Sequence, residues 1–157
     1  MRVCARLLHT IFDGAQLTTA YPAVYINNLY GSGTPHHLRF IGGEIRNSAS
    51  SQGILIESST TAPTPDYNEF IKIKMHDNGA TTLHHGVYIE SNHNLVSGCD
   101  IYNNSGFGVQ IYQDSAVNGV TTSYNIVRNN KLHDTPEREA GRAWCRLAAM
   151  ATSRTTT

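Results

Sequence analysis

Hydrophobic and polar residues alternate in short runs along most of this chain. Four runs share one form, with an apolar side chain at every second position: AVYIN from Ala23, GILIE from Gly53, GVYIE from Gly86 and GVQIY from Gly108. A period of two is typical of β-strands that bury one face. Because the runs start 30, 33 and 22 residues apart with no helical period between them, we predict repeating units built of strands alone.

Each run is followed by a second phrase in which two short apolar segments flank a bend. The phrases are LRFIGGEIRNS, FIKIKMHDNG, NLVSGCDIYNN and NIVRNNKLHD, starting at residues 38, 70, 94 and 125. One unit of three short strands cannot bury its apolar side chains alone, whereas stacked copies bury a continuous column and pair their backbones in parallel ladders. An antiparallel sandwich would instead require two-residue hairpin turns and would leave the repeat unexplained.

We therefore predict an all-β parallel solenoid of about four rungs over residues 23–134, after a lead-in of residues 1–22. In the first strand of each unit, the expected inward pairs are Val24/Ile26, Ile54/Ile56, Val87/Ile89 and Val109/Ile111. In the second and third strands, the expected inward residues are Ile41/Ile45, Ile71/Ile73/Met75, Val96/Ile101 and Val127/Leu132. The glycines that open three first strands indicate corners with positive φ or close backbone approach: Gly53, Gly86 and Gly108.

Two segments depart from the repeat. In Ser58 to Glu69, the prolines Pro63 and Pro65 exclude a ladder strand, so we predict a projecting loop beside the first-strand sheet. From residue 135 the alternation stops, and residues 135–157 form a non-repeat tail. Two interpretations of the tail remain open: an irregular or short helical cap on the open end of the solenoid, or a frame-shifted or truncated end.

Composition excludes several classes of function. Lys+Arg and Asp+Glu are equal at 12 each, so no global field favours nucleic acid. No apolar run approaches the roughly 18 residues of a membrane span, and the first residues show no signal-peptide pattern. The cysteines, Cys4, Cys99 and Cys145, have no metal-binding spacing, and their odd number identifies no redox compartment.

The segment HHGVYIESNHNLVSGCDIYNNSGFGVQIY, residues 84–112, resembles the right-handed parallel β-helix repeat of pectate-lyase-like proteins, and the resemblance extends over residues 23–134. It implies a carbohydrate-active protein that binds a polysaccharide and cleaves it as a lyase or glycoside hydrolase. The alternative is a non-catalytic module for glycan adhesion or structure, because fold alone does not decide function. The family also suggests an extracellular or cell-surface location.

In this family, asparagines often stack in a ladder at the bend between the second and third strands. The equivalent positions here are Gly43, Ile73, Cys99 and Asn130. We therefore expect no continuous asparagine ladder at that bend.

The resemblance also implies that sugars bind along the outside of the first-strand sheet. Outward positions there form two columns with one residue per rung. The first column is Tyr25, Leu55, Tyr88 and Gln110, and the second is Asn27, Glu57, Glu90 and Tyr112. Rungs in register would place Glu57 and Glu90 about 4.8 Å apart. That spacing suits an acid/base pair for glycosidic cleavage or a calcium site, calcium being the one cofactor suggested. The alternative is two solvated surface carboxylates.

The remaining candidates surround these glutamates. Tyr25, Tyr88, Gln110 and Tyr112 are the candidate sugar-binding residues, since tyrosine combines a flat apolar face with a hydroxyl, although exposed strands favour tyrosine in any case. His85 lies in the turn before the first strand of the third unit. It is a candidate catalytic acid or base at the rim of the groove; the alternative is a solvated turn residue. Three basic residues are expected to point outward from the other sheets, which argues against a simple lyase: Lys72, Lys74 and Arg128.

Overall fold

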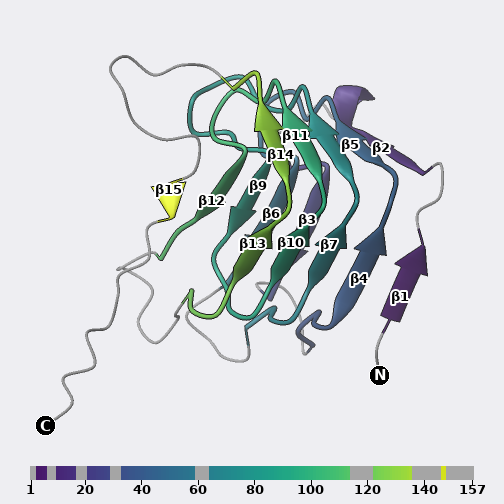
Figure 1. Ribbon diagram of the computed structural model, residues 1–157, viewed down its shortest axis with the longest axis vertical. Coiled ribbons are helices and arrows are strands. Elements are labelled where there is room, and N and C mark those ends of the chain that lie inside the picture. Colours follow the sequence, from purple (N-terminus) through teal and green to yellow (C-terminus); the bar gives the residue numbers. More distant parts are fainter. Residues whose placement is uncertain are drawn as a thin grey trace, which may run out of the picture.

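The structure, a computed structural model, describes residues 3–6, 10–16, 21–28, 33–58, 64–113, 122–135 and 146–147. The chain forms short strands that coil around one axis (Figure 1). The early strands are β1 (Val3–Arg6), β2 (Ile11–Asp13), β3 (Val24–Asn27), β4 (Leu38–Ile41), β5 (Glu44–Arg46), β6 (Ile54–Glu57), β7 (Glu69–Ile71) and β8 (Lys74–His76). The later strands are β9 (Val87–Ile89), β10 (Leu95–Ser97), β11 (Asp100–Tyr102), β12 (Val109–Ile111), β13 (Ile126–Arg128), β14 (Lys131–His133) and β15 (Arg146–Leu147). A single 3-10 turn, η1 (Gly14–Gln16), follows β2.

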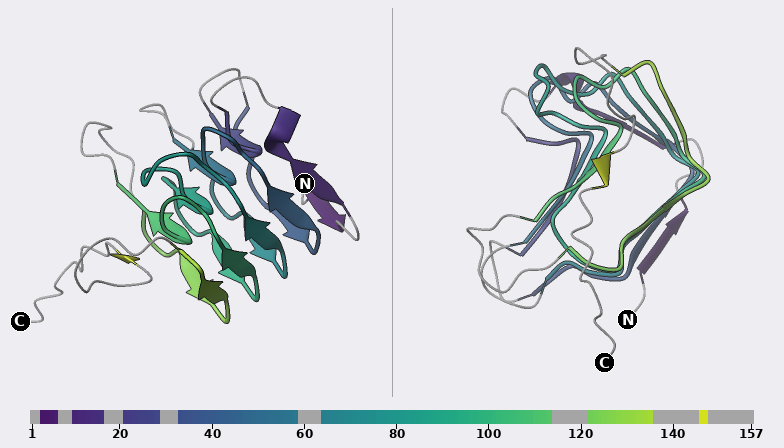
Figure 2. Two further views of the ribbon diagram at one scale, coloured as in Figure 1. Left: turned by 90° about the horizontal axis from the view of Figure 1, so that it is seen from above. Right: turned by 60° about the vertical axis from the view of Figure 1, so that its left-hand side comes forward.

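The strands form three five-stranded parallel sheets. Sheet A has the order β1-β4-β7-β10-β13, sheet B the order β14-β11-β8-β5-β2, and sheet C the order β15-β12-β9-β6-β3. Each strand pairs with the strand three places later in the chain, so every rung contributes one strand to each sheet (Figure 2). The predicted parallel solenoid is therefore confirmed, with four successive units from β3 to β14. The lead-in segment contributes β1 and β2 to sheets A and B.

Sheet C follows the predicted alternation. All eight expected inward residues of its strands are buried: Val24, Ile26, Ile54, Ile56, Val87, Ile89, Val109 and Ile111. Each aligns with its equivalent on the next rung, as Ile56 does with Ile89 and Ile89 with Ile111. Since parallel strands lie about 4.8 Å apart, these columns form a continuous apolar core.

The prediction that Ile41 and Ile71 point inward is wrong. Both are partly exposed, and they pair with each other at the ends of β4 and β7. The inward position of sheet A is one residue earlier, where the Phe40 and Phe70 rings stack with centroids 5.3 Å apart.

A bend between sheets A and B explains this error. Lys72 adopts a positive φ of 54° immediately after β7, which turns the chain and restarts the alternation. Ile71 therefore faces outward, while Ile73 and Met75 beyond the bend are buried as predicted. Ile45, Val96 and Ile101 are also buried, and Val127 and Leu132 pack against the core while partly buried.

Asparagine ladders occupy the other two corners of the solenoid. Between sheets C and A, the Nδ2 of Asn68 donates to the Oδ1 of Asn94 at 3.1 Å, and Asn94 donates likewise to Asn125 at 3.1 Å. Between sheets B and C, Asn78 donates to Asn104 at 2.9 Å. No continuous ladder was expected at the bend between sheets A and B. Of the four equivalent positions there, only that of the last described unit holds an asparagine, Asn130. These amides satisfy buried backbone groups, which the corners would otherwise leave without partners.

The glycines that open the strands of sheet C are required by close backbone approach. A Cβ added to Gly53 would lie 2.7 Å from the carbonyl oxygen of Gly86, and a Cβ on Gly86 would lie 2.7 Å from that of Gly108. Neither glycine has a positive φ. Of the two predicted reasons for these glycines, close approach is therefore the correct one.

The two irregular segments are described in part. Pro65 lies outside any strand, as predicted, but it is buried at the corner, where its carbonyl accepts from Asn68 at 2.7 Å and from Ser91 at 3.1 Å. Of the predicted loop from Ser58 to Glu69, Glu69 already belongs to β7, and residues 59–63 lie outside the described residues. The predicted helical cap likewise falls mostly on residues that are not described, and β15 in the tail pairs with β12. Within the described ranges, no helix is long and apolar enough to cross a membrane.

Candidate functional site on the outer face of sheet C

The outward positions of sheet C line up as predicted. Tyr25, Leu55, Tyr88 and Gln110 occupy partner positions on successive strands. Asn27 pairs with Glu57 in the second column. Parallel pairing continues one residue beyond β9 and β12, because the amide of Glu90 donates to Ile56 at 2.8 Å and that of Tyr112 donates to Ile89 at 3.0 Å. Glu57, Glu90 and Tyr112 therefore have equivalent places on successive rungs.

The carboxylate of Glu57 is held by a tyrosine of the preceding rung. The Tyr25 hydroxyl donates a hydrogen bond to Oε2 of Glu57. This bond joins the two outward columns, since Tyr25 belongs to one and Glu57 to the other. A hydrogen bond to an ionised acceptor is stronger than one between neutral groups, so Glu57 presents its carboxylate in a defined orientation.

Two further tyrosines form the aromatic part of the face. The rings of Tyr88 and Tyr112 have centroids 6.1 Å apart at an interplanar angle of 21°. Tyr112 is 40% exposed. Gln110, which pairs with Tyr88 and lies on the same rung as Tyr112, is partly exposed. The face thus combines aromatic rings, carboxylates and the amides of Asn27 and Gln110.

His85 does not lie at an exposed rim, contrary to expectation. It is 2% exposed, its Nδ1 accepts the Phe107 amide at 2.9 Å, and its ring stacks on that of Phe107 at 5.4 Å. Burial, with a smaller contribution from His84, lowers the pKa of His85 to about 4. A neutral buried imidazole is unsuited to proton exchange with a surface ligand near neutral pH. His85 instead packs 5.5 Å from the Tyr88 ring and supports it.

The basic side chains that the structure describes lie away from this face. Lys72, Lys74 and Arg128 are exposed on or beside sheets A and B, as expected. The other basic side chains that are described also belong to those sheets: Arg39, Arg46 and Lys131. On sheet C, strands β3, β6, β9 and β12 carry no lysine or arginine, and β15 places Arg146 at the partner position of Gln110.

A calcium ion at this face would need ligands beyond the two glutamates. Calcium takes six to eight oxygen ligands. Across the part of the chain that the structure describes, no three His, Cys, Asp or Glu side chains are grouped to hold a metal. Glu57 and Glu90 could supply two carboxylates, and water or a bound sugar acid would have to complete the shell.

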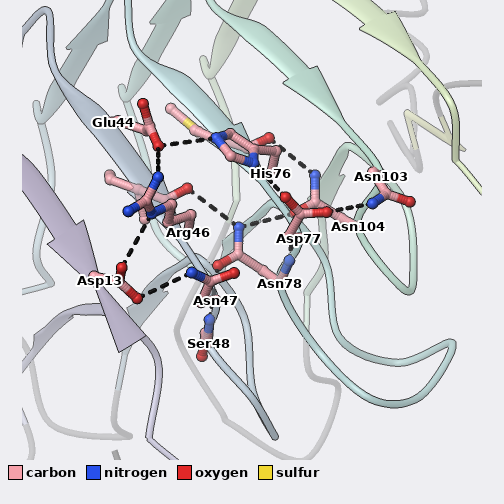
Figure 3. Close-up of polar contacts among 12 residues, drawn as sticks. Asp13, Glu44, Arg46, Asn47, Ser48, His76, Asp77, Asn78, Asn103 and Asn104 are labelled. Atoms are coloured by element: carbon pink, nitrogen blue, oxygen red, sulfur yellow. Dashed lines mark hydrogen bonds and ion pairs between the residues drawn. The ribbon is translucent and has the colours of Figure 1, made fainter. Parts of the chain in front are cut away.

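Sequence reasoning missed a second polar cluster, on the outer face of sheet B (Figure 3). His76 lies between two carboxylates, with Nδ1 2.6 Å from Asp77 and Nε2 3.2 Å from Glu44. Arg46 bridges Glu44 at 2.8 Å and Asp13 at 3.1 Å. A repeated residue pair in the sequence could have revealed this cluster. It ends the third strand of each unit: RN at 46–47, HD at 76–77, YN at 102–103 and HD at 133–134.

The same arrangement recurs two rungs further along sheet B. His133 lies 2.7 Å from Asp134 and 2.9 Å from Asp100, and these hydrogen bonds raise its pKa. The Tyr102 ring stacks between the two histidines, 4.6 Å from His76 and 4.9 Å from His133. Because these rings and charges contact one another, the cluster holds adjacent rungs together.

A third feature is a stack of rings at the corner between sheets C and A. His37, Tyr67, His93 and Tyr124 all adopt φ between 55° and 61°. Their ring centroids are 4.8, 4.5 and 4.8 Å apart along the stack. Tyr67 and His93, the inner rings, have both faces covered by neighbours, so these two rings offer only edges to a sugar, whereas stacking requires a ring face.

Comparison with known proteins identifies the family. A family model described as "Right handed beta helix region" matches residues 19–143, which is most of the chain. No curated protein and no solved structure gives a significant match. The family match agrees with three parallel sheets in one solenoid and is consistent with the pectate-lyase-like resemblance. The chain therefore belongs to the right-handed β-helix family.

Proposed function

We propose that this protein binds a polysaccharide along the outer face of sheet C. Family membership indicates a carbohydrate-related or adhesive role and goes no further. The observation that supports the finer proposal is the alignment of Glu57, Glu90 and Tyr112 at equivalent positions of successive rungs. An extended polymer needs such a repeating row of contacts. We also propose an extracellular or cell-surface location for the protein.

Each group on this face has a role that suits a sugar. The exposed ring of Tyr112 offers a flat apolar surface to a pyranose. The carboxylates of Glu57 and Glu90 accept hydrogen bonds from hydroxyl groups, and the Gln110 amide both donates and accepts. Because all of these side chains project from a backbone that is fixed in paired strands, no loop has to be ordered on binding.

The test is calorimetric titration of the folded protein with neutral and charged oligosaccharides. We expect Tyr112→Ala to weaken binding about 3–10-fold, the usual contribution of one aromatic contact. Tyr124→Ala is the matched control, since Tyr124 is 76% exposed at a different corner. Equal loss in both variants, or binding that neither variant changes, would exclude sheet C as the binding face.

The placement of the glutamates favours one second candidate, glycoside hydrolysis. Strands on adjacent rungs are about 4.8 Å apart, near the roughly 5 Å between the carboxyl groups of retaining enzymes. The hydrogen bond from Tyr25 suits Glu57 to the role of nucleophile or base, which leaves Glu90 as the proton donor. Lyase chemistry is not part of this proposal, since the strands beside the two glutamates, β3, β6, β9 and β12, carry no lysine or arginine base.

Product analysis distinguishes binding from hydrolysis. If the pair is catalytic, the protein releases new reducing ends from a bound polysaccharide, and Glu90→Gln abolishes the release while retaining binding. If the wild-type protein binds the polysaccharide and releases no reducing ends, the adhesive role stands and the hydrolytic candidate is rejected.

A further inference from the structure

We propose that two copies of this chain associate through the outer faces of their sheets B, related by a two-fold axis parallel to the strands. The inference rests on one outward column of sheet B, whose residues occupy partner positions on four successive rungs: Glu44, Lys74, Asp100 and Lys131. This column includes none of the candidate polysaccharide-binding residues of sheet C, so the inference does not depend on the proposed function.

The charges of this column alternate in sign from one rung to the next. Such alternation would stabilise the stack itself if the charges paired across adjacent strands. The two lysines do not form such pairs. Both are exposed, and among the residues that the structure describes the side chains of Lys74 and Lys131 make no ion pair and no hydrogen bond. Their ammonium groups are therefore available to a partner.

The two acids of the column are oriented by neighbouring side chains. Oε1 of Glu44 lies 2.8 Å from Arg46 and 3.2 Å from His76 (Figure 3). Oδ1 of Asp100 lies 2.9 Å from Nε2 of His133. Within the described ranges, the second oxygen of each carboxylate, Oε2 of Glu44 and Oδ2 of Asp100, accepts no hydrogen bond. Each acid is thus held in place with one oxygen left to accept a bond from another copy.

A two-fold axis parallel to the strands makes this column complementary to itself. Such an axis turns the sheet over and reverses the order of its rungs, so the first position faces the fourth of the second copy, and the second position faces the third. Glu44 then faces Lys131 of the second copy, and Lys74 faces Asp100 of the second copy. Two sheets packed face to face lie about 10 Å apart, a gap that a lysine and a carboxylate side chain span together.

The neighbouring outward column of sheet B fits the same arrangement. It opposes His76 to Tyr102 of the second copy, and Arg46 to His133 of the second copy. Arg46 and His133 are each bound to two carboxylates of their own copy, so their approach leaves no unbalanced positive charge.

The association should be weak and sensitive to salt. Symmetry doubles the two contacts of the charged column to four, and each is an exposed ion pair, a kind of contact that contributes little by itself. The electrostatic screening length falls from about 10 Å at about 0.1 M salt to about 3 Å at about 1 M. Sedimentation velocity over a concentration series should therefore show reversible dimers at the lower salt concentration and monomers at the higher one.

Charge reversal at Lys74 tests the pairing without removing any described contact of that side chain. Lys74→Glu sets two carboxylates against each other at two symmetric places, so it should raise the dissociation constant of the dimer at least about tenfold. Arg128→Glu reverses a charge on sheet A and should leave the dimer unchanged. Circular dichroism checks that both variants fold. A dimer that Lys74→Glu does not weaken, or that Arg128→Glu weakens equally, overturns the assignment to sheet B.

A mixture of two variants distinguishes contact between copies from alternation within one copy. Asp100→Lys should be monomeric by itself, because Lys74 then faces a lysine. In an equimolar mixture with Lys74→Glu, every position of the column again faces the opposite charge, so a heterodimer should form with a dissociation constant within about threefold of the wild-type value.

Two further results would overturn the proposal. One is a wild-type protein that stays monomeric at every concentration in low salt. The other is a mixture of the two folded variants that does not associate. If Asp100→Lys does not fold, the dissociation constant of Lys74→Glu decides alone.

Discussion

Single side chains in this solenoid are positioned by partners one rung away. Tyr25 orients Glu57 across 32 residues of sequence, and the Phe107 amide donates to His85 across 22. In both cases the partners lie on neighbouring rungs, so the rung repeat brings them together. The consequence is that one substitution affects the adjacent rung as well as its own.

His85 provides a prediction about pH. Its folded-state pKa of about 4 lies below the ordinary value of 6.5, so the unfolded chain binds a proton that the folded protein excludes. Stability should therefore fall as the pH decreases from about 6.5 to about 4, by on the order of 2 kcal/mol. Urea unfolding at pH 7.5 and pH 4.5 measures this difference.

The variant His85→Asn serves as the comparison for this pH dependence. Asparagine offers an oxygen acceptor near the position of Nδ1 and has no titrating group. The loss of stability between pH 7.5 and pH 4.5 should be smaller in the variant than in the wild-type protein. Equal losses in the two proteins would show that other groups determine the acid sensitivity.

At the level of the structural elements, ladders of like side chains stabilise the strands, which have only two to four residues each. Such short strands supply few backbone hydrogen bonds, and the corners between them turn buried amides away from the sheets. The Asn68–Asn94–Asn125 ladder supplies acceptors for these amides, since the Oδ1 of Asn94 accepts from the backbone of Asn68 at 3.0 Å. On the outer surface of sheet B, the stacked rings also join neighbouring rungs, through ring contacts in place of hydrogen bonds.

The asparagine ladder predicts unequal effects of two identical substitutions. Asn94→Ala removes bonds to both neighbouring rungs and leaves a buried amide without its acceptor, so it should cost about 2–4 kcal/mol. Asn125→Ala also removes the acceptor of the Asn94 amide, but Asn125 is only partly buried and its described ladder bonds go to one neighbouring rung, so this variant should cost less. Chemical denaturation of both variants measures the difference. Equal costs would mean that the ladder does not transmit stability between rungs.

The whole molecule is a one-dimensional stack in which each rung contacts mainly the rungs beside it. Its apolar core is continuous, and Ile89 lies within it, fully buried between Ile56 and Ile111. A rung in the middle of the stack cannot be lost without separating the rungs on either side. Stability of the molecule therefore depends on its central rungs.

This dependence predicts that Ile89→Asp prevents folding. An unpaired buried carboxylate costs several kcal/mol, a large part of the 5–15 kcal/mol that stabilises a typical domain. Gln110→Asp is the control, because it places the same side chain on the outer face of the same sheet. Circular dichroism should show loss of cooperative thermal unfolding in the first variant alone. A cooperative transition in Ile89→Asp would contradict the continuous core.

The sequence by itself determined the solenoid and the alignment of its outer columns. Successive side chains of a strand point to opposite faces, so a local pattern such as GVYIE specifies which residues are buried and which face outward. Equal offsets from Gly53, Gly86 and Gly108 then place Glu57, Glu90 and Tyr112 on one row of stacked strands. These properties need no knowledge of distant contacts.

Only the tertiary structure decided the phase of sheet A, the burial of His85 and the ladders at the corners. The positive φ of Lys72 restarts the alternation and turns Ile71 outward. His85 is buried because Phe107, from the next rung, covers it. Asn68 and Asn94 meet across 26 residues of sequence. Alternation within a strand is a local property of the backbone, whereas these contacts exist only once one rung has stacked on another.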